Sequence, residues 1–108
     1  MVVGLGCSSG AAQPSADLSR QGDETFGAIC AKCHGQEGKG GLPLTPGGPA
    51  PRDLSDPTWQ ASVTDAQLRT AIQNGKLPIM PAFATVLTQQ QIDAVVGKVR
   101  RLRRKADQ

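Results

Sequence analysis

The residues with the clearest chemistry stand in one pentapeptide, Cys30-Ala-Lys-Cys33-His34. A tetrahedral zinc site would need a fourth donor, but the chain has no other histidine and no second cysteine cluster. A thioredoxin-like redox pair would stand within a βαβ pattern, and none is visible around this motif. The spacing is instead typical of c-type haem attachment, in which both thiols reach one edge of the porphyrin and the imidazole reaches the iron.

A haem iron held by one imidazole leaves a further axial position, for which Met80 is the candidate. Met1 is the only other methionine, and it precedes a stretch rich in glycine and serine. Pro78 and Pro81 flank Met80 and stiffen the backbone, because proline fixes φ. A thioether on such a loop suits axial ligation, which raises the reduction potential. The alternative is a core methionine that fills a gap.

The pentapeptide needs an element to carry it, and a helical pattern precedes it. Apolar or small residues recur at steps of three and four, at Leu18, Gly22, Phe26, Ile29 and Cys33. This spacing predicts a helix that begins near Leu18, with Asp17 or Ser19 as its N-cap. The helix would carry the attachment motif at its C-terminal end and stop at Gly35.

Two later helices are predicted by capping boxes, at residues 64–67 and 88–91. The first helix would end at Gly75, and the second carries an apolar stripe over residues 92–102. A short helical turn is predicted around Trp59. Because no segment alternates with period two, the chain is predicted to be all-α.

The composition indicates that something other than side chains fills part of the core. The chain has 108 residues, of which only three are aromatic, while 13 are glycine and eight are proline. Residues 35–57 alone hold six glycines and five prolines, and we predict that this loop wraps a flat ligand. A large apolar macrocycle would complete the core, so the protein without it is predicted to fold poorly.

Length and charge exclude several classes of protein. The chain is long enough for one domain and lacks the roughly 20-residue apolar run of a membrane span. Its net charge of +3 arises at the C-terminus, because residues 1–99 hold seven Lys and Arg against eight Asp and Glu. The basic tail, residues 100–105, is too small for a nucleic-acid site. It is either a docking surface for an acidic partner or anionic lipid, or a solvated helix end.

The motifs occur in a familiar order. They are Gly22-x-x-x-Phe26, Cys30-Ala-Lys-Cys33-His34, Met80-Pro81-Ala-Phe83 and a final apolar helix. Over residues 18–104 the chain therefore resembles the class I monohaem c-type cytochromes of the short bacterial kind. The resemblance implies a cytochrome c fold, with about three to five helices around one covalently attached haem c. Its first and last helices would cross, with Gly22 and Gly97 as points of close approach; the alternative is that either glycine is merely tolerated at its position.

The resemblance also implies roles for individual residues. The haem-binding residues would be Cys30 and Cys33 as thioethers, His34 as the proximal ligand and Met80 as the distal ligand. A loop carbonyl, of Pro49 or Pro51, would accept a hydrogen bond from the imidazole. Arg52 and Trp59 are candidates to bind the haem propionates; a solvated arginine and a core tryptophan are the alternatives. The family often has an aromatic residue in its last helix, where this chain has Lys98 or a neighbour.

A six-coordinate iron has no vacant position, so the resemblance implies an electron carrier and not an enzyme. It would dock transiently with redox partner proteins through a small interface, as a monomer, and without a nucleic-acid partner. One alternative is a haem domain in which Met80 leaves, acting as a small-ligand sensor or an enzyme subunit. A Cys-x-x-Cys module without haem is the other. No distal acid/base pair is visible in the sequence, which disfavours an enzyme.

The expected location follows from the cofactor, because c-type haem is attached outside the cytoplasm. The resemblance thus implies a periplasmic or extracytoplasmic protein in a respiratory chain. Leu5-Gly6-Cys7 resembles a lipoprotein cleavage site, which would make Cys7 a lipidated N-terminus and a membrane tether; a free thiol is the alternative. We expect a signal-like start and tether over 1–17, a cytochrome domain over 18–104 and a polar tail over 105–108.

Overall fold

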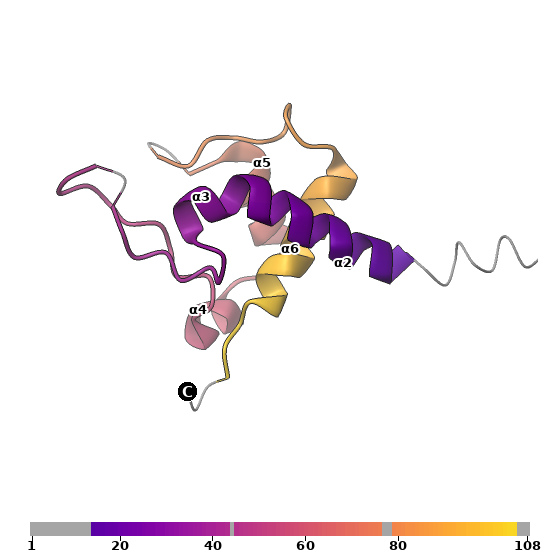
Figure 1. The fold of residues 1–108 in the computed structure, drawn as a ribbon, viewed down its shortest axis with the longest axis horizontal. Coiled ribbons are helices and arrows are strands. Elements are labelled where there is room, and N and C mark those ends of the chain that lie inside the picture. Colours follow the sequence, from indigo (N-terminus) through magenta and orange to yellow (C-terminus); the bar gives the residue numbers. More distant parts are fainter. Residues whose placement is uncertain (1–13, 44, 77–78, 106–108) are drawn as a thin grey trace, which may run out of the picture.

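A computed structural model describes residues 14–43, 45–76 and 79–105 of the protein, and their regular structure is helical (Figure 1). The elements are α2 (Pro14–Thr25), the π-helical turn η1 (Phe26–Cys30), α3 (Ala31–His34), α4 (Pro57–Ser62), α5 (Asp65–Asn74) and α6 (Gln89–Arg101). Within the described ranges, strand-like pairing is limited to one bridge between Lys76 and Met80. The all-α prediction is confirmed.

The first helix begins earlier than predicted. It is helical from Pro14, so residues 14–17, which we assigned to the tether, are part of α2. Asp17 and Ser19, the predicted N-caps, lie inside the helix. Two features permit this start: a proline is tolerated in the first turn, where its missing N–H has no helical acceptor, and the Asp17 carboxylate there suits the helix dipole.

The helix that carries the attachment motif contains one turn of a different pitch. Between Phe26 and Cys30 it is π-helical, and the Ala31 N–H donates to the carbonyl of Phe26, five residues back. The sequence stripe predicted an uninterrupted α-helix here, so this turn is a correction. The chain then resumes as α3 and ends at Gly35, whose φ of 85° stops the helix as predicted. Turns of this kind are frequent at functional sites.

Helices α2 and α6 cross each other (Figure 1). A Cβ added to Gly22 would lie 2.3 Å from the carbonyl oxygen of Ala94 in α6, so only glycine permits this approach. The predicted close approach at Gly22 is confirmed. The same prediction for Gly97 is wrong, because a Cβ there would meet only the side chain of Arg101, at 3.5 Å.

Lys98 takes part in the same crossing, at the place where an aromatic residue was expected. Its Nζ lies 5.9 Å from the centroid of the Phe26 ring and 3.2 Å from the Asp23 carboxylate. The aliphatic stem of a lysine can cover apolar surface while its ammonium group stays near a ring face and an anion.

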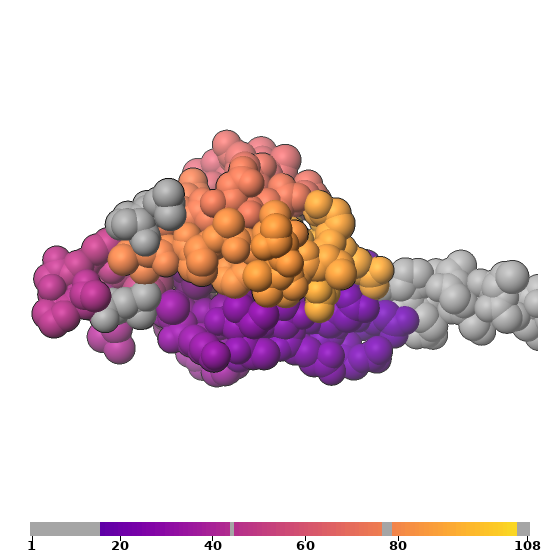
Figure 2. Space-filling model, turned by 90° about the horizontal axis from the view of Figure 1, so that it is seen from above, coloured from indigo at the N-terminus to yellow at the C-terminus, as the bar shows by residue number. Residues whose placement is uncertain are grey.

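Seen from above, the N-terminal helix and the segments that follow α5 lie side by side along the molecule (Figure 2).

The core is built mainly from the buried face of α6, against which residues of η1, α5 and two loops pack. Its buried apolar members are Phe26, Leu54, Leu68, Ile72, Leu87, Ile92, Val95, Val96 and Val99. Both predicted capping boxes are present, with Thr64 and Thr88 as the N-caps of α5 and α6. The short helix around Trp59 is also confirmed, as α4.

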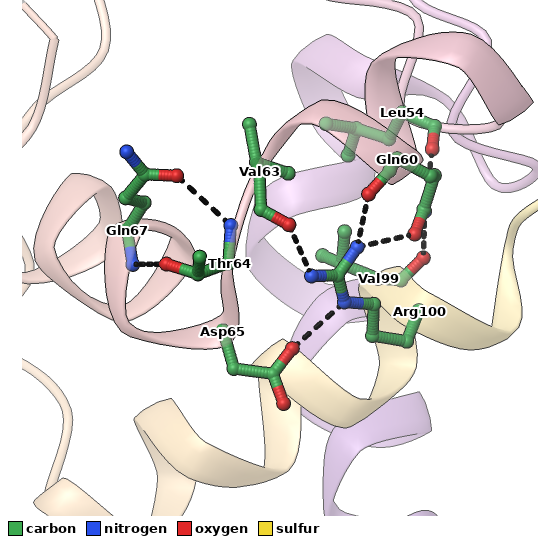
Figure 3. Close-up of polar contacts among 8 residues, drawn as sticks. All are labelled: Leu54, Gln60, Val63, Thr64, Asp65, Gln67, Val99 and Arg100. Carbon is green, nitrogen blue, oxygen red and sulfur yellow. Dashed lines mark hydrogen bonds and ion pairs between the residues drawn. The ribbon is translucent and has the colours of Figure 1, made fainter.

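Arg100 ties α6 to the junction between α4 and α5 (Figure 3). Its guanidinium donates to the carbonyl and the side-chain oxygen of Gln60, at 2.7 and 2.9 Å, and to the carbonyl of Val63, at 2.6 Å. Its Nε donates to Asp65 at 2.7 Å. Gln60 is buried and in turn donates to the carbonyl of Val99, at 2.7 Å. This network joins three helices around one side chain.

We expect Arg100→Ala to lower the free energy of unfolding by about 2–3 kcal/mol, because it leaves the buried Gln60 oxygen without its donor. Guanidinium titration followed by circular dichroism measures this loss. Arg69→Ala is the matched control, since its ion pair with Asp93 is exposed and should contribute less than about 1 kcal/mol. Equal losses in the two variants would contradict the role given to Arg100.

The basic tail is largely neutralised within the molecule. Ion pairs join Arg100 to Asp65, Arg101 to Asp23 and Arg104 to Asp53. In the described part of the chain, Arg103 and Lys105 are the tail cations without an ion pair. The tail thus mainly holds α6 to the rest of the fold, which weakens the hypothesis of a docking surface.

Candidate functional site

One cavity of about 340 Å³ brings the predicted haem-binding residues together. Cys30, Cys33 and His34 line it from the end of the N-terminal helix, and Met80 lines it from a segment 46 positions further along the chain. The rest of the lining is mainly apolar and includes Ile29, Ile79 and Phe83. An imidazole and a methionine thioether are ligands that suit haem iron, and the two thiols beside the imidazole match the haem attachment motif.

The imidazole of His34 is oriented by a backbone carbonyl. Its Nδ1 lies 3.1 Å from the carbonyl oxygen of Arg52. A carbonyl can only accept, so Nδ1 carries the proton and Nε2 keeps the lone pair that a metal needs. The predicted acceptors, Pro49 and Pro51, both line the cavity, but neither bonds to His34. The carbonyl of Pro51 accepts instead from the N–H of Gly41, at 3.3 Å.

The glycine-rich segment after α3 lies against the segment that supplies this carbonyl. The Gly40 N–H donates to the carbonyl of His34 at 2.7 Å, and the Leu54 N–H donates to the carbonyl of Gly38 at 2.6 Å. Gly40 has a φ of 57°, and a Cβ there would lie 2.4 Å from the carbonyl oxygen of Pro51. Within the predicted ligand-wrapping loop, residues 38–41 therefore pack against residues 51–54, next to the backbone of His34.

Backbone hydrogen bonds hold the segment that carries Met80. Lys76 and Met80 exchange two hydrogen bonds, both 2.9 Å, and the Phe83 N–H donates to the carbonyl of Ile72 in α5 at 3.0 Å. The prediction that Pro78 stiffens the backbone concerns a residue outside the described ranges. The pairing between Lys76 and Met80 anchors the loop at the methionine itself.

Gly75 is packed directly behind this segment. Its φ is 76°, and an added Cβ would lie 2.6 Å from the carbonyl oxygen of Met80 and 2.7 Å from the carbonyl carbon of Pro81. The sequence identified Gly75 only as a helix stop. Its position against Met80 was missed, because no local pattern reports which backbone a helix-ending glycine will meet.

The two cysteines differ in environment. Cys33 is exposed and Cys30 is half-buried, and neither forms a disulfide. Burial, together with the neighbouring Cys33 sulfur, raises the pKa of the Cys30 thiol to about 11. The free Cys30 thiol is therefore protonated at neutral pH, and it lies among Ile29 and other apolar neighbours of the cavity.

Arg52 and Trp59, the predicted propionate contacts, lie together. The guanidinium carbon of Arg52 is 5.5 Å from the centroid of the Trp59 ring, and Arg52 also lines the cavity. The Trp59 side chain packs against the hydrophobic core. Their role toward propionates stays a prediction. Cys7, the predicted lipidation site, lies outside the described residues.

A model of the protein family described as "Cytochrome C oxidase, cbb3-type, subunit III" matches residues 17–97. The chain belongs to this family. It is 34% identical over 94 residues to the "Cbb3-type cytochrome c oxidase subunit FixP" of Azorhizobium caulinodans, which covers 87% of this chain and 30% of that protein. It is 37% identical over 79 residues to the "Cbb3-type cytochrome c oxidase subunit CcoP" of Rubrivivax gelatinosus, covering 73% of this chain and 24% of that one.

Among solved structures, the "KustC0563 c-type cytochrome" superposes with a TM-score of 0.65 at 29% identity, over 77% of this chain and 98% of that one. The predicted cytochrome c fold and the predicted covalent haem c are thereby confirmed, and the domain is one of electron transfer. The chain spans less than a third of the length of both curated relatives. None of the described helices is both long and apolar enough to span a bilayer.

Proposed function

We propose that Cys30 and Cys33 bind the haem through thioethers and that His34 and Met80 are its axial ligands. The observation that carries this proposal is the single cavity lined by all four residues. The hydrogen bond from His34 Nδ1 to the Arg52 carbonyl supports it, because it leaves Nε2 for the metal. When bound, the haem supplies an iron that alternates between the ferric and ferrous states. Two protein ligands leave no position for a substrate, so the function is one-electron transfer.

The other residues of the cavity would set the conditions for that transfer. The apolar side chains of the lining, Ile29, Ile79 and Phe83, would exclude water. Without water, a redox centre favours the oxidation state that carries the smaller net charge. Arg52 and Lys76 are the charged residues of the lining, and both are cations. Their positive charge would stabilise an added electron, and Arg52 with Trp59 would bind a propionate group.

We further propose that the chain serves a respiratory chain in the periplasm or elsewhere outside the cytoplasm. The support is its similarity to two proteins named as subunits of cbb3-type cytochrome c oxidases. Transient docking of redox partners, a monomeric state and a lipid tether at Cys7 stay predictions. Because residues 14–17 are helical, we now place the start of the cytochrome domain at Pro14 instead of Leu18.

The test is an optical spectrum of the haem-loaded protein, oxidised and reduced, with and without carbon monoxide. We expect a thioether-to-ferric-iron charge-transfer band, and no spectral change when carbon monoxide is added to the reduced protein. Met80→Ala is the matched control and should lose the band and bind carbon monoxide. Binding of carbon monoxide by the unaltered protein would favour a sensor or enzyme subunit with a labile Met80, and a protein that takes up no haem would overturn the proposal.

A further inference from the structure

Residues 52–55 connect the imidazole of His34 to the C-terminal end of the chain. The first residue of this segment supplies the carbonyl that accepts from His34 Nδ1, at 3.1 Å. The last residue, Ser55, is only 2% exposed, and its carbonyl accepts from the Arg104 N–H at 3.0 Å. The partner of the imidazole thus lies three residues from a backbone anchor on the segment after α6.

Side chains reinforce this anchor. Arg104 Nη1 donates to Asp53 Oδ2 at 3.1 Å and to the Ser55 hydroxyl at 2.8 Å. Asp53 Oδ1 accepts from the Ser55 N–H at 2.9 Å and from the Ser55 hydroxyl at 2.6 Å. Burial tends to raise the pKa of Asp53, but the hydrogen bonds from Ser55 and Arg104 outweigh it and lower that pKa below its usual value. The three side chains form a closed ring of polar contacts beside Arg52.

The residue between Asp53 and Ser55 is held as well. The Leu54 N–H donates to the carbonyl of Gly38 at 2.6 Å, and the Leu54 carbonyl accepts from Gln60 Nε2 at 2.9 Å. Gln60 Nε2 also donates to the carbonyl of Val99 at 2.7 Å. Every residue from 53 to 55 is therefore held by polar contacts, which limits the freedom of the Arg52 carbonyl that precedes them.

We propose that Arg104 is a positioning residue for His34, because it holds residues 52–55 so that the Arg52 carbonyl stays on the imidazole Nδ1–H. This inference rests on the proposed function, in which His34 binds the iron. A firm hydrogen bond at Nδ1 makes an imidazole a stronger electron donor to its metal. The contact between Arg104, Asp53 and Ser55 thereby favours the oxidised state of the site, although Arg104 touches neither the cavity nor the histidine.

The test compares R104Q with R103Q in the haem-loaded chain. Both variants remove one positive charge, from adjacent positions. They differ in contacts, because Arg103 is exposed and makes no side-chain bond among the described residues, whereas Arg104 pairs with Asp53. We expect the His34 Nδ1 proton, followed by nuclear magnetic resonance of the reduced protein, to exchange with solvent at least tenfold faster in R104Q. At one fixed mediator potential, the ratio of reduced to oxidised protein should be at least threefold higher in R104Q than in R103Q.

Equal exchange rates and equal redox ratios in the two variants would overturn the inference. If R104Q does not retain haem, D53N carries the test, since asparagine keeps the acceptor for Ser55 but removes the charge that Arg104 contacts. Unaltered exchange of the His34 proton in D53N would overturn the inference equally. Failure of the proposed function itself is separate: a His34→Ala protein that keeps the native spectrum would show that His34 is not the ligand.

Discussion

Gly22→Ala is expected to destabilise the protein more than any other methyl-sized change at the helix crossing, by about 3 kcal/mol. The added Cβ would lie 2.3 Å from the Ala94 carbonyl oxygen and 3.1 Å from its carbonyl carbon. Both are backbone atoms in the middle of α6, so they cannot rotate away as a side chain could. The two helices would have to separate, and Phe26, which is buried in the same crossing, would lose contacts. Guanidinium unfolding of the haem-loaded protein measures the loss.

Gly97→Ala is the matched control, because it makes the same change in the interior of α6. Its Cβ would meet only the flexible end of Arg101, at 3.5 Å. Alanine is a better helix former than glycine by about 0.5–1 kcal/mol, so this variant should be as stable as the parent or slightly more stable. If Gly22→Ala proved as stable as Gly97→Ala, the close crossing of α2 and α6 would be wrong.

Gly75→Ala is expected to displace Met80 from its place in the cavity. The Cβ would meet the backbone of residues 80–82 at 2.6 to 2.8 Å, and the φ of 76° disfavours alanine by a further 1–2 kcal/mol or so. The Met80 segment, which is paired to Lys76, can relieve the clash by moving away from the end of α5. We therefore expect most ferric molecules to lose the thioether charge-transfer band and the reduced protein to bind carbon monoxide.

Gly47→Ala separates the clash from the backbone strain. Gly47 has the same φ of 76°, but a Cβ there would have nothing within 4 Å. This variant should carry the conformational penalty alone and keep the charge-transfer band. Loss of the band in both variants, or in neither, would show that the packing of Gly75 against residues 80–82 does not hold Met80.

The features that the sequence predicted well are local. A capping box spans four residues, and both predicted boxes are present, with N-caps at Thr64 and Thr88. Gly35 and Gly75 end their helices as predicted, because the stop signal lies in the glycine itself. The haem attachment motif is likewise contained in five adjacent residues, and it led to the family that the comparisons confirm.

The features that the sequence could not predict depend on distant partners. Every residue has a carbonyl, so no pattern could select Arg52 as the acceptor for His34 over two nearby prolines. The pairing of Arg100 with Asp65 and of Arg104 with Asp53 joins positions far apart in the chain, which made the tail look like a free basic patch. The family resemblance pointed to Gly22 and Gly97 alike as points of close approach, and the crossing geometry distinguishes them.

The π-helical turn at Phe26–Cys30 changes the direction in which the residues after it face, relative to the residues before it. Upstream of it, α2 presents Gly22 to α6; downstream, Cys33 and His34 line the cavity. A helix of uniform pitch would keep Gly22 and Cys33, eleven positions apart, close to the same angular bearing. The wider turn rotates the helix surface that carries the haem attachment motif, about the helix axis, relative to the surface that packs against α6. Loss of one residue from positions 27–29 would therefore leave both motifs intact in the sequence and rotate them out of register in space.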